Sequence, residues 1–322
     1  MHGFINLNKP VDWTSHDCVA RTRRLLNTKK IGHGGTLDPL ATGVLPLAVG
    51  RATRLLQYLP EGKAYQAIIR FGLTTTTDDL EGDIVEGRSA TGLDRATVDA
   101  ALSQFIGKIE QIPPMYSAIQ VEGKRLYDLA RAGKAVEVPR RKVTIERLVS
   151  QRWKAGAQPE LTVAVTCGMG TYIRSLARDL GEAVGTGATL AGLIRTHSSG
   201  FEIAQSISLE ELEQAIAQGT FTPVPAGKAV AHLDAIILPP DLARRWQLGQ
   251  KLAVTPDMPI PEPIGQQYPP VRILEATTQT FLGISEIRSM STDTEGTCAE
   301  RNAPTGSHSK ILAPKRVFLS AD

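Results

Sequence analysis

The spacing of apolar positions along the chain predicts strands and helices in mixed order. Apolar runs that alternate with polar residues and end at Gly or Pro indicate strands, whereas apolar residues near helical spacing, with a capping residue at one end, indicate helices. Because the two kinds of element do not alternate steadily, the pattern favours an α+β fold over a doubly wound parallel sheet. Strands are expected over residues 3–10, 64–72, 142–150, 160–167 and 188–201, and helices over 14–27, 95–107, 171–184 and 208–216.

The chain changes character near residue 220. Proline and glycine in the segment 221–230 are typical of a linker, and the short strand-like runs that follow predict a small β-rich domain. We therefore divide the chain into domains at 1–228 and 229–322. Residues 289–310 carry almost no large apolar side chains, which predicts a disordered surface loop in the second domain. Strands are expected there over 251–256, 269–274, 281–288 and 316–320.

Composition narrows the class of protein. At 322 residues, with 42% hydrophobic and 21% charged side chains, the chain can bury a core without disulfides or a structural metal. No apolar run reaches the roughly 18 residues of a membrane span, and the N-terminus lacks the pattern of a signal peptide. The three cysteines and six histidines are scattered, so neither a disulfide framework nor a zinc or other metal site is expected. We expect a protein of the reducing cytoplasm.

The formal net charge of +3 hides an uneven distribution. Residues 1–70 contain ten Lys/Arg against four Asp/Glu, residues 71–100 two against seven, and residues 101–150 nine against five. Two basic stretches separated by an acidic one suggest a polyanionic partner, although from charge alone a solvated charged surface is the favoured interpretation.

One acid, Asp38, lies alone in a glycine-rich apolar stretch, 29–54, with basic residues at both ends. Taken by itself, Asp38 followed by Pro39 is typical of a helix N-cap with proline at the first helical position. The nearby glycines lack the GK[ST] sequence of a P-loop and do not form G-x-G-x-x-G, so a nucleotide cofactor is not expected.

The same stretch, read as a whole, is far more specific. The segment GHGGTLDPLATGVLPLAVGRATR resembles the catalytic motif of tRNA pseudouridine synthases of the TruB family. Further blocks match the family in its order: LNKPVDWTSHD, KAYQAIIRFG, TTTTDDLEGDIVE, IPPMYSAIQVEGKRLYDLARAGKAVEVPRRKV and CGMGTYIRSLARDLG. The resemblance covers roughly residues 3–200, with a weaker match over the C-terminal domain. One departure is Asp12, where the family has Gly; Asp adopts the left-handed conformation at modest cost, so the turn is expected to survive.

The resemblance implies a fold and a reaction. The fold would be a catalytic domain built on a mixed or antiparallel sheet, with a small PUA-like RNA-binding domain at the C-terminus. The enzyme would isomerise the uridine at position 55 in the T loop of tRNA to pseudouridine. The N1–C1′ bond breaks, the uracil turns and C5 bonds to C1′; nothing is added, so no cofactor or metal is needed.

The family's shared aspartate matches Asp38, and the sequence leaves open whether it acts as nucleophile or as base. Arg174 would keep this carboxylate ionised, because a guanidinium lowers the pKa of a nearby acid. Tyr65 matches the tyrosine that stacks on the flipped base. His33 would fill the gap left in the RNA, and weaker matches place Tyr172 and Leu193 as pocket walls and Lys9 as a support of the pocket.

RNA contacts are expected from an insertion at about 113–145, whose sequence predicts a strand, a helix ending at Gly133 and an extended exit. Its basic residues would bind phosphates and orient the RNA without reading bases. The basic residues are Lys124, Arg125, Arg131, Lys134, Arg140, Arg141 and Lys142.

Three hypotheses remain. The first is an enzyme that acts on the tRNA T arm without an obligate protein partner or guide RNA. The second is a relative that needs a guide RNA and partner proteins, which the short N-terminus argues against. The third is an RNA-binding or tRNA-folding module, which the presence of Asp38, Tyr65 and Arg174 argues against.

Overall fold

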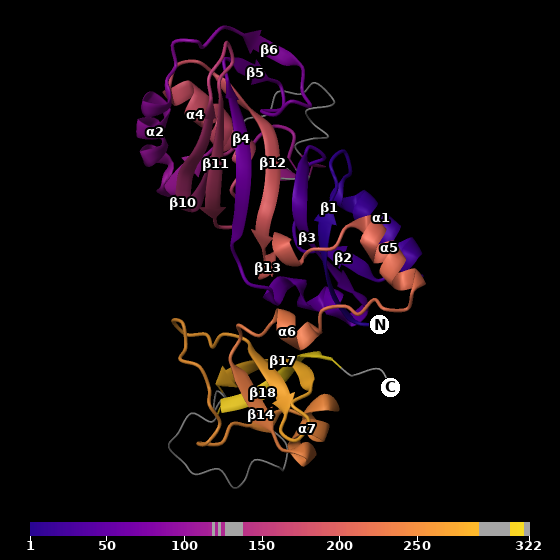
Figure 1. Ribbon diagram of the computed structural model, residues 1–322. Helices are drawn as coiled ribbons and strands as arrows, with labels where there is room; N and C mark the ends of the chain where they lie inside the picture. Colours follow the sequence, from indigo (N-terminus) through magenta and orange to yellow (C-terminus); the bar gives the residue numbers. More distant parts are fainter. Residues whose placement is uncertain (118–119, 122–123, 126–137, 290–309, 319–322) are drawn as a thin grey trace. The chain divides into compact units, whose positions relative to one another are not determined.

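The computed structural model describes residues 1–117, 120–121, 124–125, 138–289 and 310–318 (Figure 1). They form two compact units. The larger comprises Ile5–Leu47 and Glu61–Phe221, and the smaller comprises Met1–Phe4, Ala48–Pro60 and Thr222–Asp322. Much of the predicted insertion, including its expected helix, lies outside the described residues, and so do residues 290–309 of the loop expected at 289–310. Within the described part, no helix is both long and apolar enough to cross a membrane.

A mixed sheet organises the larger unit. Its described strands follow the order β1-β3-β12-β4-β11-β10-β7, with β2 beside β3 and β13 beside β12. The pair β12–β3 is parallel, whereas β12–β4, β4–β11, β11–β10 and β10–β7 are antiparallel. This confirms the α+β class with a mixed sheet. The strands are β1 (Gly3–Lys9), β2 (Ile31–His33), β3 (Ala41–Val49), β4 (Lys63–Phe71), β7 (Gly107–Gln111), β10 (Arg141–Lys154), β11 (Glu160–Cys167), β12 (Ala188–Ser198) and β13 (Phe201–Glu202).

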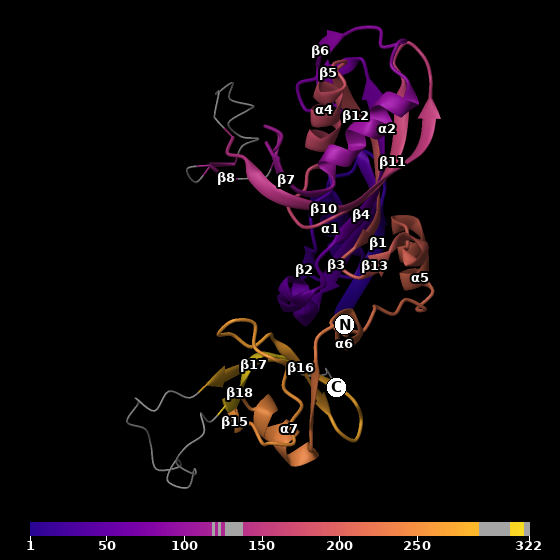
Figure 2. The same cartoon turned by 90° about the vertical axis from the view of Figure 1, so that its left-hand side faces the viewer.

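Helices cover this sheet. Helix α4 packs on β12, α2 lies beside α4, and α1 lies beside α5 (Figures 1 and 2). Thr14 and Ser208, the first residues of the helices expected at 14–27 and 208–216, each form a capping box. The helices are α1 (Ser15–Leu25), α2 (Arg95–Leu102), α4 (Ile173–Ala183) and α5 (Leu209–Ala217). Short hairpins join β5 (Leu73–Thr75) to β6 (Ile84–Gly87) and β8 (Gln120–Val121) to β9 (Lys124–Arg125).

Alternation along two central strands builds the core of the larger unit. On β4, Tyr65, Ala67, Ile69 and Phe71 are buried, and the alternate apolar residues of β11 face the same core. Successive side chains of a strand point to opposite faces. The face of β4 that buries Ile69 therefore also carries Tyr65 and Lys63 at the strand's beginning.

The smaller unit contains a five-stranded sheet within its described residues, in the order β14-β16-β17-β18-β15. Its core surrounds Trp246, whose indole N–H donates to Ser285 Oγ at 3.3 Å. The strands predicted at 251–256, 269–274 and 281–288 overlap β15, β16 and β17. The strand predicted at 316–320 is misplaced, because β18 runs from Lys310 to Val317 and shares only two residues with that range. β14, α7 and the 3-10 helix η1 (Gly50–Tyr58) were not predicted. The elements are α6 (Ala226–Ala229), β14 (Ala235–Leu238), α7 (Pro240–Gln247), β15 (Leu252–Ala253), β16 (Val271–Glu275), β17 (Phe281–Ser289) and β18 (Lys310–Val317).

The sequence interpretation of Asp38 as a helix N-cap is wrong. Residues 38–40 form a turn, and β3 follows directly. The apolar run after the turn is buried between β1 and β12, so pairing across the sheet satisfies its backbone groups. The expected turn at Asp12 is confirmed: its φ is 63°, and its backbone N–H donates to the Pro39 carbonyl at 3.0 Å.

Gly43 in β3 is expected to be intolerant of any side chain. Its φ is 100°, and an added Cβ would lie 2.3 Å from the Arg195 carbonyl oxygen. Gly43→Ala should therefore lower the free energy of unfolding of the larger unit by about 2–5 kcal/mol, from backbone strain and overpacking together. Gly62 is a matched control, because its φ is 102° but nothing lies within 4 Å of an added Cβ. Gly62→Ala should cost about 1–2 kcal/mol. Equal urea midpoints for the two variants would contradict the packing argument.

Candidate active site

The turn that carries Asp38 is stabilised by the buried side chain of Lys9. Lys9, at the end of β1, is fully buried, and its ammonium donates to the backbone carbonyls of Trp13 at 2.5 Å, Pro10 at 2.8 Å and Pro39 at 3.2 Å. The Asp12 backbone N–H reaches the same Pro39 carbonyl. Burial lowers the pKa of Lys9. Because its donors are committed to backbone, Lys9 lies behind the site and holds the turn in place.

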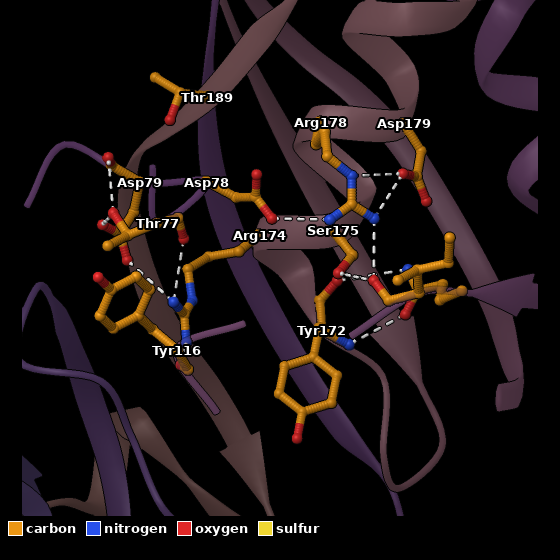
Figure 3. A network of polar contacts seen from close by, with 12 residues as sticks. Thr77, Asp78, Asp79, Tyr116, Tyr172, Arg174, Ser175, Arg178, Asp179 and Thr189 are labelled. Carbon is orange, nitrogen blue, oxygen red and sulfur yellow. Dashed lines mark hydrogen bonds and ion pairs between the residues drawn. The ribbon is translucent and has the colours of Figure 1, made fainter. Parts of the chain in front are cut away.

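Arg174, on α4, is the cation that faces Asp38. Its Nε lies 3.0 Å from Asp38 Oδ2, and its Nη1 lies 3.5 Å from Asp79 Oδ2. The guanidinium also donates to the carbonyls of Thr77 at 3.0 Å and Tyr116 at 2.9 Å (Figure 3). The Arg174 side chain is 5% exposed, whereas that of Asp38 is 38% exposed. The arginine is thus fixed by several partners, and the aspartate keeps an open side.

The acidic loop before β6 supplies the second carboxylate. Asp79 is 2% exposed and accepts hydrogen bonds from the Thr77 hydroxyl at 2.5 Å and the Glu81 backbone N–H at 3.1 Å. Its neighbour Asp78 pairs with Arg178 at 2.8 Å, one helical turn beyond Arg174 on α4 (Figure 3). Two arginines on one helix face therefore bind two consecutive acids of the loop.

Asp38 has an unusual electrostatic environment. Burial raises its pKa above the usual value for aspartate, Arg174 opposes the rise, and the Asp79 carboxylate adds to it. We expected Arg174 to keep the carboxylate ionised; it acts in that direction but does not cancel the effect of burial. A carboxylate of this kind is more basic and more nucleophilic than a solvated one.

A cavity of about 660 Å³ opens beside Asp38. Tyr65, Tyr172, Leu193 and Arg174 line it together with Asp38. Tyr65 is 7% exposed, and burial raises its pKa to about 12, an effect that the Arg195 guanidinium opposes. Tyr65 is therefore a neutral phenol near pH 7, with a ring surface and a hydroxyl at the cavity wall. Five of the seven predicted site residues thus meet in one cavity.

His33 and Lys9 do not line that cavity. His33 ends β2, and burial followed by the charge of Arg195 lowers its pKa. Its Nδ1 is buried, and the Gly35 backbone beside the ring opposes the lowering of the pKa. It is therefore a neutral imidazole on the strand that precedes the Asp38 turn. Within the described residues, no group of His, Cys, Asp or Glu could hold a metal ion.

The sequence interpretation missed four residues around the cavity: Asp79, Glu81, Lys63 and Arg195. Arg195, on β12, is fully buried and donates to the carbonyls of Val44 at 2.7 Å, Thr36 at 3.2 Å and Gly35 at 3.1 Å. It thereby ties both sides of the Asp38 turn to the sheet. Its one sequence signal is an arginine inside an otherwise apolar strand, which is costly unless its donors are paired.

Comparisons with known proteins identify the family. A profile described as TruB family pseudouridylate synthase, N-terminal domain, matches residues 23–173, and one described as tRNA pseudouridylate synthase B C-terminal domain matches residues 174–243. A Trichormus variabilis protein named tRNA pseudouridine synthase B is 56% identical over 288 residues, covering 89% of this chain and 95% of the relative. The chain belongs to the TruB family of pseudouridylate synthases. It is therefore an isomerase.

Other TruB-family relatives and solved structures agree. Proteins of the same name from Synechocystis sp. and Gloeobacter violaceus are 56% and 51% identical, over 81% and 88% of this chain and 88% and 94% of their own. A chain in a structure described as an H/ACA RNP bound to a substrate RNA containing 2′-deoxyuridine has a TM-score of 0.70 at 25% identity, covering 99% of this chain and 85% of its own. One in a Cbf5-Nop10-Gar1 complex has a TM-score of 0.70 at 27% identity, covering 98% and 85%.

Proposed function

We propose that this TruB-family enzyme isomerises uridine to pseudouridine at position 55 in the T loop of tRNA, and that Asp38 is the acting carboxylate. The target nucleotide is flipped into the cavity, and no cofactor takes part. The observation that carries the proposal is the Asp38–Arg174 ion pair, which opens into a cavity that also holds the ring of Tyr65.

The geometry fits the steps of the reaction. Breaking the N1–C1′ bond leaves positive charge on the ribose and negative charge on the uracil. A carboxylate can stabilise the positive charge on the ribose, either by bonding to C1′ as a nucleophile or by taking a proton from C2′ as a base. The Asp38 side chain is 38% exposed, and this exposed part is available for the contact with the ribose. Arg174 fixes the orientation of Asp38, while Tyr65 holds the detached base as it turns and C5 bonds to C1′. The C5 hydrogen then leaves to solvent.

Supporting roles follow from placement. Tyr172 and Leu193 act as walls that keep the base in the cavity, and Lys9 holds the turn of Asp38. We assign His33 to the space that the flipped base leaves in the RNA stack. The described basic residues Arg140 and Arg141, at the exit of the insertion, are exposed and suit phosphate contacts.

The substrate assignment draws on the relatives. The proteins more than 50% identical to this chain are named tRNA pseudouridine synthase B, whereas the similarity to chains in H/ACA complexes is 25–27%. The difference in identity favours an enzyme that acts on tRNA without a guide RNA or obligate protein partner. Residues 229–322 would act as a PUA-like RNA-binding domain. We place the enzyme in the cytoplasm, where buried free thiols such as Cys18 and Cys167 stay reduced.

The test uses a T-arm hairpin with one target uridine carrying tritium at C5. The full-length enzyme should release the label to water in several turnovers, without added metal or cofactor. The control hairpin carries its only labelled uridine in the stem and cytidine at position 55, and it should release none. Tight binding of the target hairpin with no release would leave an RNA-binding module as the function, and release only with added guide RNA would favour the second hypothesis.

A further inference from the structure

A second cation lies at the cavity that contains Asp38. Lys63 is the first residue of β4, and it shares a face with Tyr65 because alternate residues of a strand point the same way. Both side chains line the cavity. The Lys63 side chain is half-buried, and burial followed by the charge of Arg195 lowers its pKa. An ammonium in this position is already partly desolvated before any ligand arrives.

Lys63 has no acidic partner among the residues that the structure describes. The acids nearest Arg174, which are Asp38 and Asp79, pair with that arginine. After burial, the groups that affect the pKa of Lys63 are the Arg195 guanidinium and the Cys167 thiol, and these acids are not among them. The cavity therefore has an acidic wall, occupied by Arg174, and a basic wall at the beginning of β4.

The basic wall meets the glycine-rich loop at Gly35. A Cβ added at Gly35 would lie 3.6 Å from Lys63 Nζ and 3.8 Å from Arg195 Nη1. Arg195 donates to the carbonyls of Gly35 and Thr36 in the loop and of Val44 in β3, it also interacts with the Tyr65 hydroxyl, and its side chain is fully buried. A ligand in the cavity therefore meets the ammonium of Lys63, with the positive charge of Arg195 behind it.

We propose that Lys63 binds a phosphodiester group that flanks the target uridine. The inference rests on the proposed function, because it requires a flipped nucleotide in this cavity. Such a nucleotide brings its two flanking phosphates to the rim of the pocket. Two residues of a strand span about 7 Å, which is similar to the separation of base and phosphate in one nucleotide. A uracil on Tyr65 thus places a phosphate at Lys63 and turns the ribose toward Asp38.

The first experiment measures binding and salt dependence. Lys63→Met keeps the length of the side chain and removes its charge. It should weaken binding of the T-arm hairpin about tenfold, the loss expected for one charge-assisted contact. The slope of log binding constant against log salt should become less negative by about 0.7–0.9, because one counterion fewer is released. Lys63→Arg should retain both.

A matched control and a modified RNA identify the contact. Lys154, at the opposite end of the same sheet, has a side chain 69% exposed beside Glu160, and Lys154→Met should change neither quantity. A hairpin with an uncharged methylphosphonate at the contacted phosphate, 5′ or 3′ of the target, should bind the wild-type enzyme about tenfold more weakly. The Lys63→Met variant should bind the methylphosphonate hairpin as tightly as it binds the native hairpin, because the variant already lacks the ammonium that would contact this phosphate.

Two results would overturn the proposal. One is additivity, in which each methylphosphonate substitution weakens RNA binding by the Lys63→Met variant as much as it weakens RNA binding by the wild-type enzyme. The other is a Lys63→Met variant whose release rate at saturating RNA falls while its affinity and salt slope stay unchanged; Lys63 would then act on the departing uracil. Failure of the proposed function would be recognised by a different result: the wild-type enzyme would release no tritium from the native hairpin at any concentration.

Discussion

Asp38→Asn should release no measurable tritium from the T-arm hairpin, a loss of at least about 10⁴-fold. The amide has the shape of the carboxylate but is neither a nucleophile nor a base, so the N1–C1′ bond should stay intact. Binding of the hairpin should fall no more than severalfold, because Asp38 contributes no phosphate contact. The measurement is single-turnover release at saturating enzyme, paired with equilibrium binding of the same RNA.

Asp83→Asn is the matched control for this substitution. Asp83 is an exposed acid of the loop that carries Asp79, and it does not line the cavity. The variant should release tritium at the wild-type rate. Release by Asp38→Asn at more than a few per cent of that rate would refute the assignment of the acting group.

The pH dependence of tritium release in the same assay reports the protonation state of Asp38. Burial raises the pKa of its carboxyl above the usual value of 3.8. The wild-type rate should therefore fall on the acid side with a midpoint above that value, because protonation removes the reactive form.

Local signals in the sequence were sufficient for much of the fold. Thr14 and Ser208 cap helices because each interacts with a residue three positions along the chain. Both partners lie within one short segment, so the capping pattern can be recognised in the sequence. The alternation of β4 and β11 is equally local. Asp38 misled for the opposite reason: the turn after it enters β3, and that strand exists because β12, some 150 residues later, pairs with it. Long-range pairing overrides the local preference of an Asp-Pro pair.

The site shows the same division. The resemblance to the family supplied Asp38, Tyr65 and Arg174, and the structure gathers them in one cavity. For Arg195 the sequence offered only one weak signal, an arginine inside a largely apolar strand, and propensity and spacing offered none for Asp79. Arg195 on β12 binds carbonyls on both sides of the Asp38 turn, and Asp79 of the polar loop pairs with Arg174. These contacts join segments that are distant in the sequence, so they can be identified only in the folded structure.

Arg174→Met should reduce both stability and turnover. The change leaves Asp79, which is 2% exposed, without its cation, and it also removes donors to two backbone carbonyls. Breaking a buried pair from one side costs about 3–5 kcal/mol of unfolding free energy. The release rate at saturating RNA should fall about 10²–10³-fold, as for loss of a positioned charge in an active site. Urea unfolding and single-turnover release measure the two effects.

The pH dependence separates an electrostatic role of Arg174 from a packing role. Without the guanidinium, the largest of the effects that oppose burial is lost and only the smaller effect of Lys9 remains, so the pKa of Asp38 should rise further. A carboxyl whose pKa is higher in the folded than in the unfolded state binds protons preferentially when folded, so stability increases as pH falls through that range. The stability deficit of Arg174→Met should thus shrink as the pH is lowered from neutrality toward the raised pKa of Asp38. Arg178→Met, which unpairs the more exposed Asp78 on the same helix face, should cost less and leave most of the release rate. A pH-independent deficit would assign Arg174 to packing alone.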